Sequence, residues 1–313
     1  MKYEFIREQS STYMVSELCK ILEIKRAAYY QWQKRRASSR SIEEAKVYSS
    51  IMYYYTQSKG RYGLLNLTAA IRKDGQKVNK KRIYRIMKKY NIRSVTKRKF
   101  RITTKHDGKG RYSENLIKGN FQTVRSNQLW SSDITYIRTS EGWLYLAVVL
   151  DVYRRKIVGW SLSSRINAEI VREAINMALR HERPPVGVIF HSDRGSQYTS
   201  NMVRKLLAEN GFKQSMSSTA NCYDNAITET FFATLKKELV YQKKFTTREE
   251  AKNEIFEYIE IYYNRKRQHS SLNYLSPLEF ENMIGNKKEE VDINNIKEEN
   301  VFNNKLGVDY LCV

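Results

Sequence analysis

Three acidic residues, Asp133, Asp193 and Glu229, lie in apolar or glycine-containing stretches where an unpaired carboxylate is costly. There are 59 residues between the first two and 35 between the second and the third. Three carboxylates at one point make a poor salt bridge but a good ligand set for divalent cations. Magnesium prefers hard oxygen ligands and takes one or two carboxylates together with substrate phosphate oxygens. These residues therefore point to phosphoryl transfer.

Each of the three residues alone also has a purely structural interpretation. A strand Asp can pair with an Arg, an Asp after a strand can cap a turn, and a Glu in a first helical turn favours the helix dipole. The three together, beside a basic N-terminal segment, favour the metal site. Other catalytic patterns are missing from the sequence, because it has neither a G-x-S-x-G motif nor a P-loop.

The elements that must position these carboxylates begin near residue 126, where the pattern changes from helical to β. Consecutive strand-like runs predict an antiparallel meander, and alternating helices and strands follow it. We expect strands at 129–137, 142–152, 154–163, 186–193 and 212–217, and helices at 167–181, 199–211, 226–240 and 247–264, with a last short helix after Pro277. This order predicts an α/β fold in which helices flank a mixed sheet.

Within this order, each acidic residue has a defined place. Asp133 lies in the middle of the first strand, on the face of Thr135 and Ile137. Asp193 comes just after the strand VGVIFH at 186–191, at its carboxyl end, where open α/β sheets bind ligands. Glu229 is in the first turn of a helix, after a polar loop at 217–225, and a lysine two turns later shares its face.

Positive charge is concentrated in the N-terminal part of the chain. Residues 1–125 carry 31 Lys and Arg against 9 Asp and Glu, whereas residues 126–285 carry 21 against 18. Such an excess predicts binding to a polyanion. A solvated basic surface without a partner is the alternative.

Two helical patterns in this basic part are candidates for DNA binding. Segments 15–24 and 26–36 are amphipathic and flank a tight break, as in a helix-turn-helix, although many helical hairpins share this pattern. A helix at 62–73 precedes Asn79, a candidate N-cap for a helix over residues 80–90. That helix has one apolar face, made of Ile83, Ile86, Met87 and Tyr90. Candidate phosphate contacts on it and on the following basic run are Lys81, Arg82, Arg85, Lys88, Lys89, Lys97 and Arg98.

The sequence also argues against a membrane-spanning protein and against a protein stabilised by disulfide bonds. The longest apolar stretch, WLYLAVVL, has the length of a strand, and the N-terminus lacks the apolar segment of a signal peptide. Three dispersed cysteines and four scattered histidines give neither a disulfide framework nor zinc-ligand spacing. We expect a reduced, cytoplasmic protein with no membrane contact.

Several motifs resemble those of the DDE transposases of the retroviral-integrase superfamily, specifically the OrfB protein of bacterial insertion sequences. They are W-x-x-D-I-T-Y at 130–136, L-D-V-Y-x-R-K-I-V-G-W at 150–160, H-S-D-R-G-S-Q-Y at 191–198, D-N-A-x-x-E at 224–229 and Y-N-x-x-R-x-H-S-S-L at 263–272. The spacing of 35 residues between the last two acids and a lysine seven residues after the glutamate are also characteristic of that group. The resemblance covers residues 1–285.

The resemblance implies an RNase H-like core that holds two Mg²⁺ or Mn²⁺ ions on Asp133, Asp193 and Glu229. It implies that Lys236 contacts DNA near the reacting end, and that Asp224 and Asn225 shape the site. The partners it implies are the terminal inverted repeats of the element and target DNA, bound by a homo-multimer in the bacterial nucleoid. An upstream OrfA protein, as a partner or a fusion, is also implied.

Departures from the family pattern are few. Thr230 stands where the family commonly has Ser, the zinc-binding domain of retroviral integrases is missing, and no sustained heptad repeat is present. We expect five segments: a helix-turn-helix-like segment 1–45, a basic DNA-binding domain 46–105, a linker 106–125, a catalytic core 126–285 and a loose tail 286–313. Two alternative functions remain open, a DNA-binding regulator without catalysis and a metal-dependent nuclease with the same core.

Overall fold

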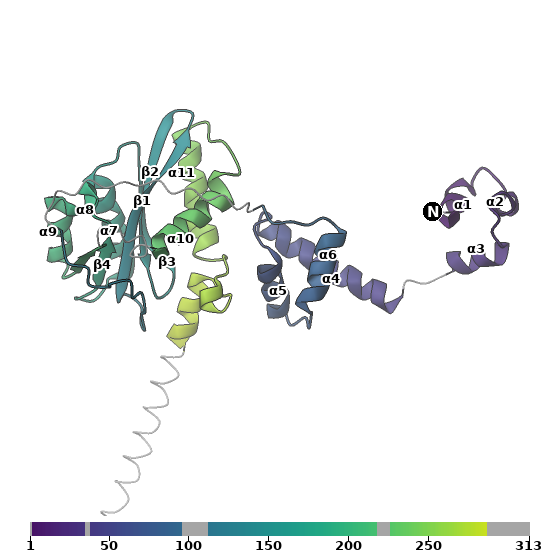
Figure 1. Ribbon diagram of the computed structural model, residues 1–313, viewed down its shortest axis with the longest axis horizontal. Helices are drawn as coiled ribbons and strands as arrows, with labels where there is room; N and C mark the ends of the chain where they lie inside the picture. The colour runs from purple at the N-terminus through teal and green to yellow at the C-terminus, as the bar shows by residue number, and fades with distance from the viewer. Residues whose placement is uncertain (1, 35–37, 96–111, 218–225, 287–313) are drawn as a thin grey trace, which may run out of the picture. The chain divides into compact units, whose positions relative to one another are not determined.

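The computed structural model describes residues 2–34, 38–95, 112–217 and 226–286 of the chain, which forms two compact units, Met1–Arg93 and Ser94–Val313. In the described residues the first unit is helical, and the second holds the sheet (Figure 1). No helix in these ranges is long and apolar enough to cross a membrane. Four residues predicted to belong to functional sites lie outside the described residues: Lys97, Arg98, Asp224 and Asn225.

The first three helices share a small core of their own. They are α1 (Lys2–Gln9), α2 (Val15–Ile21) and α3 (Arg26–Gln33), so the two helices predicted around a tight break are confirmed and α1 is additional. Their buried residues are Ile6, Leu18, Cys19 and Tyr29.

A second helical group contains α4 (Ser39–Gln57), α5 (Leu64–Lys73) and α6 (Lys80–Lys89). The side chain of Asn79 accepts a hydrogen bond from the Lys81 backbone N–H at 2.8 Å, which confirms the predicted N-cap. Ile83, Ile86 and Met87 are buried as expected. Tyr90, the C-cap of α6, is 44% exposed, although its ring packs beside that of Tyr48 on α4.

The second unit contains a five-stranded mixed sheet in the order β3-β2-β1-β4-β5. Its strands are β1 (Leu129–Thr139), β2 (Gly142–Asp151), β3 (Lys156–Ser163), β4 (Ile189–Ser192) and β5 (Lys213–Met216). The first three form the predicted antiparallel meander, and β4 and β5 add in parallel to β1. The predicted α/β architecture of a mixed sheet flanked by helices is therefore confirmed.

Helices cover both faces of this sheet (Figure 1). One core contains residues of α7 (Ala168–Glu182), α8 (Ser196–Thr199) and α9 (Asn201–Glu209) packed against the sheet. The opposite core contains residues of α10 (Ala226–Leu235) and α11 (Arg248–Phe256). Side chains alternate along β1, so Trp130 faces the first core and Ile137 the second.

Two predicted helices change geometry before they end. Helix α10 continues as a π-helical segment, η2 (Lys236–Val240), and α11 continues as η3 (Glu257–Tyr263). The backbone N–H of Tyr241 donates to the Lys236 carbonyl at 2.8 Å, five residues earlier, as a π-helical turn requires. Residues 277–286 then form the expected last helix.

Distant parts of the chain close the meander. The Asn264 side chain accepts from the Ile157 N–H at 3.0 Å and donates to the Ile157 carbonyl at 2.9 Å. Arg154, in the β2–β3 turn, lies among Asp151, Glu182 and Glu281, all within ion-pair contact. The last helix is thus tied electrostatically to that turn.

Part of the predicted linker also contacts the sheet. The N–H of Leu116 donates to the Ser215 hydroxyl at 3.0 Å, and Ile117 is buried in the core under α10. The segment boundaries predicted from the sequence stay predictions.

Candidate active site

Asp133 and Asp193 are brought together by the parallel pairing of β1 with β4. The last paired residues of these strands are Ser131 and His191, and each aspartate lies two residues beyond its strand's member of that pair. Positions two apart on a strand share a face, so both carboxylates lie on one side of the sheet where the β1–β4 pairing stops, Asp133 in the middle of β1 and Asp193 directly after β4. Here β1 has an antiparallel neighbour on one side and a parallel one on the other, where open sheets form binding crevices.

Local backbone groups orient the two carboxylates. The Ile134 N–H donates to Asp133 Oδ1 at 2.7 Å, and the Gly195 N–H donates to Asp193 Oδ1 at 3.0 Å. A Cβ at position 195 would lie 3.0 Å from that same oxygen. Glycine at this position therefore lets the loop after β4 fold back onto Asp193.

The neighbourhood of Asp133 disfavours its negative charge. Burial is the main cause, and the Asp193 carboxylate adds to it, with a smaller contribution from Glu229, so the pKa of Asp133 is raised to about 8. The Ile134 N–H and the Lys236 ammonium oppose this shift. A bound cation would relieve the charge crowding that raises this pKa.

Glu229 lies in the first turn of α10, as predicted, and its side chain is exposed. Its neighbour Thr228 is fully buried, and its hydroxyl oxygen lies 2.6 Å from that of Ser131 on β1. This hydrogen bond holds the start of α10 against β1 at Ser131, which is two residues before Asp133 on that strand. Neither hydroxyl residue was predicted to belong to the site, although Ser131 lies within the motif at 130–136 and Thr228 within that at 224–229.

The three carboxylates are gathered only in part. Asp133 and Asp193 are close neighbours, and Glu229 is near enough to influence the charge of Asp133. Among the described residues, however, no three His, Cys, Asp or Glu side chains are close enough to hold a metal ion together. The structure therefore pairs the aspartates and leaves the glutamate at the rim.

Lys236 is the first residue of η2 and is half-buried beside the site. Its Nζ lies 4.9 Å from the centre of the Tyr136 ring, a cation–π contact. Burial lowers the pKa of this lysine, and the nearby Asp133 carboxylate counteracts that shift. A partly desolvated cation close to the aspartates is well placed to bind a phosphate.

A buried polar layer lies behind the two aspartates. The Tyr198 hydroxyl is 2.9 Å from that of Ser132, and His191 Nδ1 is 2.9 Å from the Ser215 hydroxyl. Burial raises the pKa of Tyr198 well above its usual range, and the nearby Asp133 and Asp193 raise it further. Tyr198 therefore stays protonated and can support the strand only as a neutral hydrogen-bonding group.

A second buried cluster supports η2. The Arg267 guanidinium contacts the Glu238 carboxylate through Nε at 3.1 Å and through Nη2 at 3.0 Å. The Tyr258 hydroxyl donates to the same carboxylate at 2.8 Å. Glu238 lies two residues after Lys236, so this cluster anchors the turn that carries the lysine.

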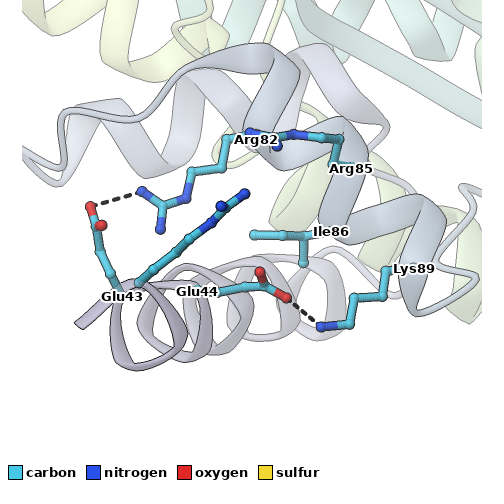
Figure 2. Close-up of a pocket in the computed structure, with 7 residues that line it drawn as sticks. Glu43, Glu44, Arg82, Arg85, Ile86 and Lys89 are labelled. Carbon is cyan, nitrogen blue, oxygen red and sulfur yellow. Dashed lines mark hydrogen bonds and ion pairs between the residues drawn. The ribbon is translucent and has the colours of Figure 1, made fainter. Parts of the chain in front are cut away.

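The cations predicted on α6 fall into two groups. Arg82 pairs with Glu43 at 2.8 Å and Lys89 pairs with Glu44 at 2.6 Å, across to α4 (Figure 2). Lys81, Arg85 and Lys88 are exposed, and their spacing places them on one face of the helix. Sequence patterns did not predict which of these cations form ion pairs, because both glutamates lie in α4, a helix that was not expected from the sequence.

Family models match most of this chain. Two models, each described as integrase core domain, match residues 123–222 and 229–284. A model described as HTH-like domain matches residues 42–100.

Two curated relatives align with most of the chain. "Transposase InsF for insertion sequence IS3A" of Escherichia coli (strain K12) is 38% identical over 284 residues, which cover 90% of this chain and 99% of that protein. "Insertion element IS600 uncharacterized 31 kDa protein" of Shigella sonnei is 40% identical over 263 residues, 84% of this chain and 97% of that protein.

Solved structures show a more distant likeness. The catalytic domain of Mos1 mariner transposase has a TM-score of 0.37 at 19% identity and covers 42% of this chain and 70% of that chain. The HTLV-2 integrase catalytic core domain in complex with magnesium (dimeric form) has a TM-score of 0.38 at 14% identity and covers 50% of this chain and 96% of that chain.

Proposed function

Because this chain belongs to the transposase family of insertion sequence IS3, we propose that it cleaves and joins DNA strands at element ends by metal-dependent phosphoryl transfer. The family assignment confirms the resemblance found in the motifs, and the integrase core match confirms the expected RNase H-like core. The observation that carries the proposal is the closeness of Asp133 and Asp193 at the point where the parallel pairing of β1 with β4 stops.

In this proposal Asp133, Asp193 and Glu229 hold two Mg²⁺ or Mn²⁺ ions. The donors fit such ions because all three are carboxylates, and because the raised pKa of Asp133 reflects negative charge that a cation would offset. Bound divalent ions supply charge stabilisation for the attacking and leaving oxygens of an in-line displacement. Glu229 would complete the ligand set from the rim of the site.

The other residues of the site have supporting tasks. Water first frees a 3′-hydroxyl at the element end, and that hydroxyl then attacks a phosphodiester of a second strand. The Lys236 ammonium binds a phosphate of the reacting end, and the Ser131–Thr228 hydrogen bond keeps Glu229 in reach of it. Asp224 and Asn225 are proposed to shape the site from the segment that precedes α10.

DNA binding follows from the HTH-like and integrase domains together. We infer that Lys81, Arg85 and Lys88 contact phosphates of the terminal repeat, whereas Arg82 and Lys89 brace α6 against α4. Lys97 and Arg98 are proposed to continue this basic track. A homo-multimer on DNA, an OrfA partner or fusion, and a place in the bacterial nucleoid are further parts of the proposal.

The division of α6 predicts different effects for two neighbouring arginines. Arg85→Ala should lower the slope of log affinity against log salt by about one, since one phosphate contact is lost. Arg82→Ala should leave that slope unchanged and lower stability modestly, because it breaks only the contact with Glu43. Titrating a terminal-repeat duplex at several salt concentrations, with thermal melting alongside, measures both. A larger slope change for Arg82→Ala would show that the roles are reversed.

A nicking assay tests the proposed function. Full-length protein is incubated with end-labelled element DNA and Mg²⁺, and we expect cleavage that EDTA stops and added Mg²⁺ restores. Glu229→Gln should bind the same DNA without cutting it. Cleavage that is unaffected by Glu229→Gln would refute the assignment. Binding without cleavage by both proteins would favour the regulator alternative or a requirement for the OrfA fusion.

A further inference from the structure

An exposed pair of aromatic rings lies on the hairpin formed by β1 and β2. In the register of these strands Tyr136 is opposite Tyr145 and Arg138 is opposite Trp143, so Tyr136 and Trp143 share one face as diagonal neighbours. Their ring centroids are 5.2 Å apart at an interplanar angle of 87°. Tyr136 is 46% exposed and Trp143 is 41% exposed.

A cation lies at each end of this pair. Lys236 Nζ is 4.9 Å from the centre of the Tyr136 ring, and Arg138 Cζ is 5.4 Å from that of Trp143. The side chains of Lys236, Tyr136, Trp143 and Arg138 therefore form a continuous row. The tip of the hairpin that carries the row is held to the start of α11, because the Glu141 carboxylate accepts a hydrogen bond from the Arg248 backbone N–H and Arg248 Nε donates to the Trp143 carbonyl.

The row begins at the proposed active site. Lys236 is close to Asp133 and its Nζ also contacts the Tyr136 ring, although Tyr136, three residues after Asp133, points to the other face of β1. The pairing of β1 with β4 stops at Ser131, so a DNA strand that leaves the two aspartates past Lys236 and crosses this edge of β1 would meet the two rings next.

We propose that Tyr136, Trp143, Arg138 and Lys236 form a stacking surface for the unpaired nucleotides of a DNA strand beside the catalytic carboxylates. The inference rests on the proposed function for the source of that strand. Aromatic rings interleaved with cations are the general means of binding single strands, because every base has a face to stack and every nucleotide has a phosphate. Duplex DNA fits less well, since its bases are stacked on one another and present no free face.

A purely structural role explains only part of these features. A cross-strand aromatic pair stabilises a hairpin by about 0.2–1 kcal/mol and gains nothing from large exposed ring faces.

The test compares a DNA end that carries a short unpaired extension with the same end carrying abasic sugars in that extension. The phosphates are identical in both, so the difference in affinity measures base stacking alone, whatever the basic N-terminal part contributes. For wild-type full-length protein we expect a preference of about fivefold to a hundredfold for the extension with bases.

Three variants decide the outcome. Trp143→Leu should lower that preference several-fold, because only the Tyr136 ring is left to stack, and Trp143→Phe should keep most of it because both positions still carry a ring. The matched control is Phe256→Leu, which removes an aromatic ring of the same unit that is 50% exposed and packs beside Trp160 on β3 rather than beside a member of the row. An equal preference in wild type and Trp143→Leu, with both proteins folded, would overturn the proposal.

Failure of the proposed function would look different. A wild-type protein that never cuts DNA but shows the Trp143-dependent preference would retain the stacking surface and lose the catalytic assignment. A wild-type protein that cuts DNA normally but shows no such preference would retain the catalytic assignment and lose the stacking surface.

Discussion

Replacing Asp133 with asparagine is expected to reduce strand cleavage by about a thousandfold or more while making the metal-free protein more stable at alkaline pH. Asparagine has nearly the same shape and can still accept the hydrogen bond from the Ile134 N–H. It loses the charge that would bind the cations. DNA binding should change little, because the proposed phosphate contacts of α6 belong to the other compact unit.

The gain in stability has a definite sign and pH window. The pKa of Asp133 is about 8 in the folded chain, above the ordinary aspartate value. The folded state therefore holds a proton that the unfolded chain has released, and stability falls as pH rises from about 4 to about 8. Asparagine cannot ionise, so this loss disappears in the variant. We expect a benefit above pH 8 that the size of this shift limits to about 5 kcal/mol, and almost none near pH 4.

Thermal melting of both proteins in EDTA, between pH 4 and 9, measures this difference. The melting temperatures should coincide at the acidic end and separate by several degrees at the alkaline end. Mg²⁺ should then raise the melting temperature of the wild type more than that of Asp133→Asn. A variant that is less stable than wild type at pH 9 would show that Asp133 holds the fold together rather than straining it.

Removal of the Arg267 side chain is expected to have the largest effect on stability. Arg267→Ala leaves the Glu238 carboxylate buried without the guanidinium that balances its charge, although the Tyr258 hydroxyl still donates to it at 2.8 Å. Breaking a buried ion pair from one side costs about 3–5 kcal/mol. The π-helical turn that carries Lys236 should loosen first, since Glu238 lies inside it.

The double variant Glu238→Gln with Arg267→Met is the matched control. It removes both charges and keeps similar volume, so its stability should lie much closer to wild type. Urea unfolding, followed by circular dichroism, gives the free energies of unfolding. Equal losses for Arg267→Ala and for the double variant would mean that the cluster acts through packing and not through charge.

Much of this fold could be predicted from local sequence patterns. The alternation of apolar residues predicted β1, β2 and β3, and the spacing of apolar side chains predicted α5, α6 and α7. The aspartates were predicted because a charge in the middle of a strand, or at its carboxyl end, requires a partner or a ligand.

Features that depend on tertiary contact could not be predicted in this way. Helix α4 is rich in tyrosine and serine and has only a weak apolar stripe, so it depends on packing against α5 and α6. The π-helical segments depend on contacts such as that of Glu238 with Arg267, 29 residues away. The pairing of α6 cations with Glu43 and Glu44 required a helix that no pattern had revealed.

The bonds that close the β-meander also set when the catalytic unit can fold. Ile157 is hydrogen-bonded to Asn264, which is made 107 residues later, and Arg154 is paired with Glu281, which is made 127 residues later. A nascent chain that has made all three meander strands still lacks both groups, and such long-range closure is slow. The site therefore becomes whole only near the end of synthesis, so a chain released before residue 281 should carry both aspartates and still lack a finished scaffold to hold them.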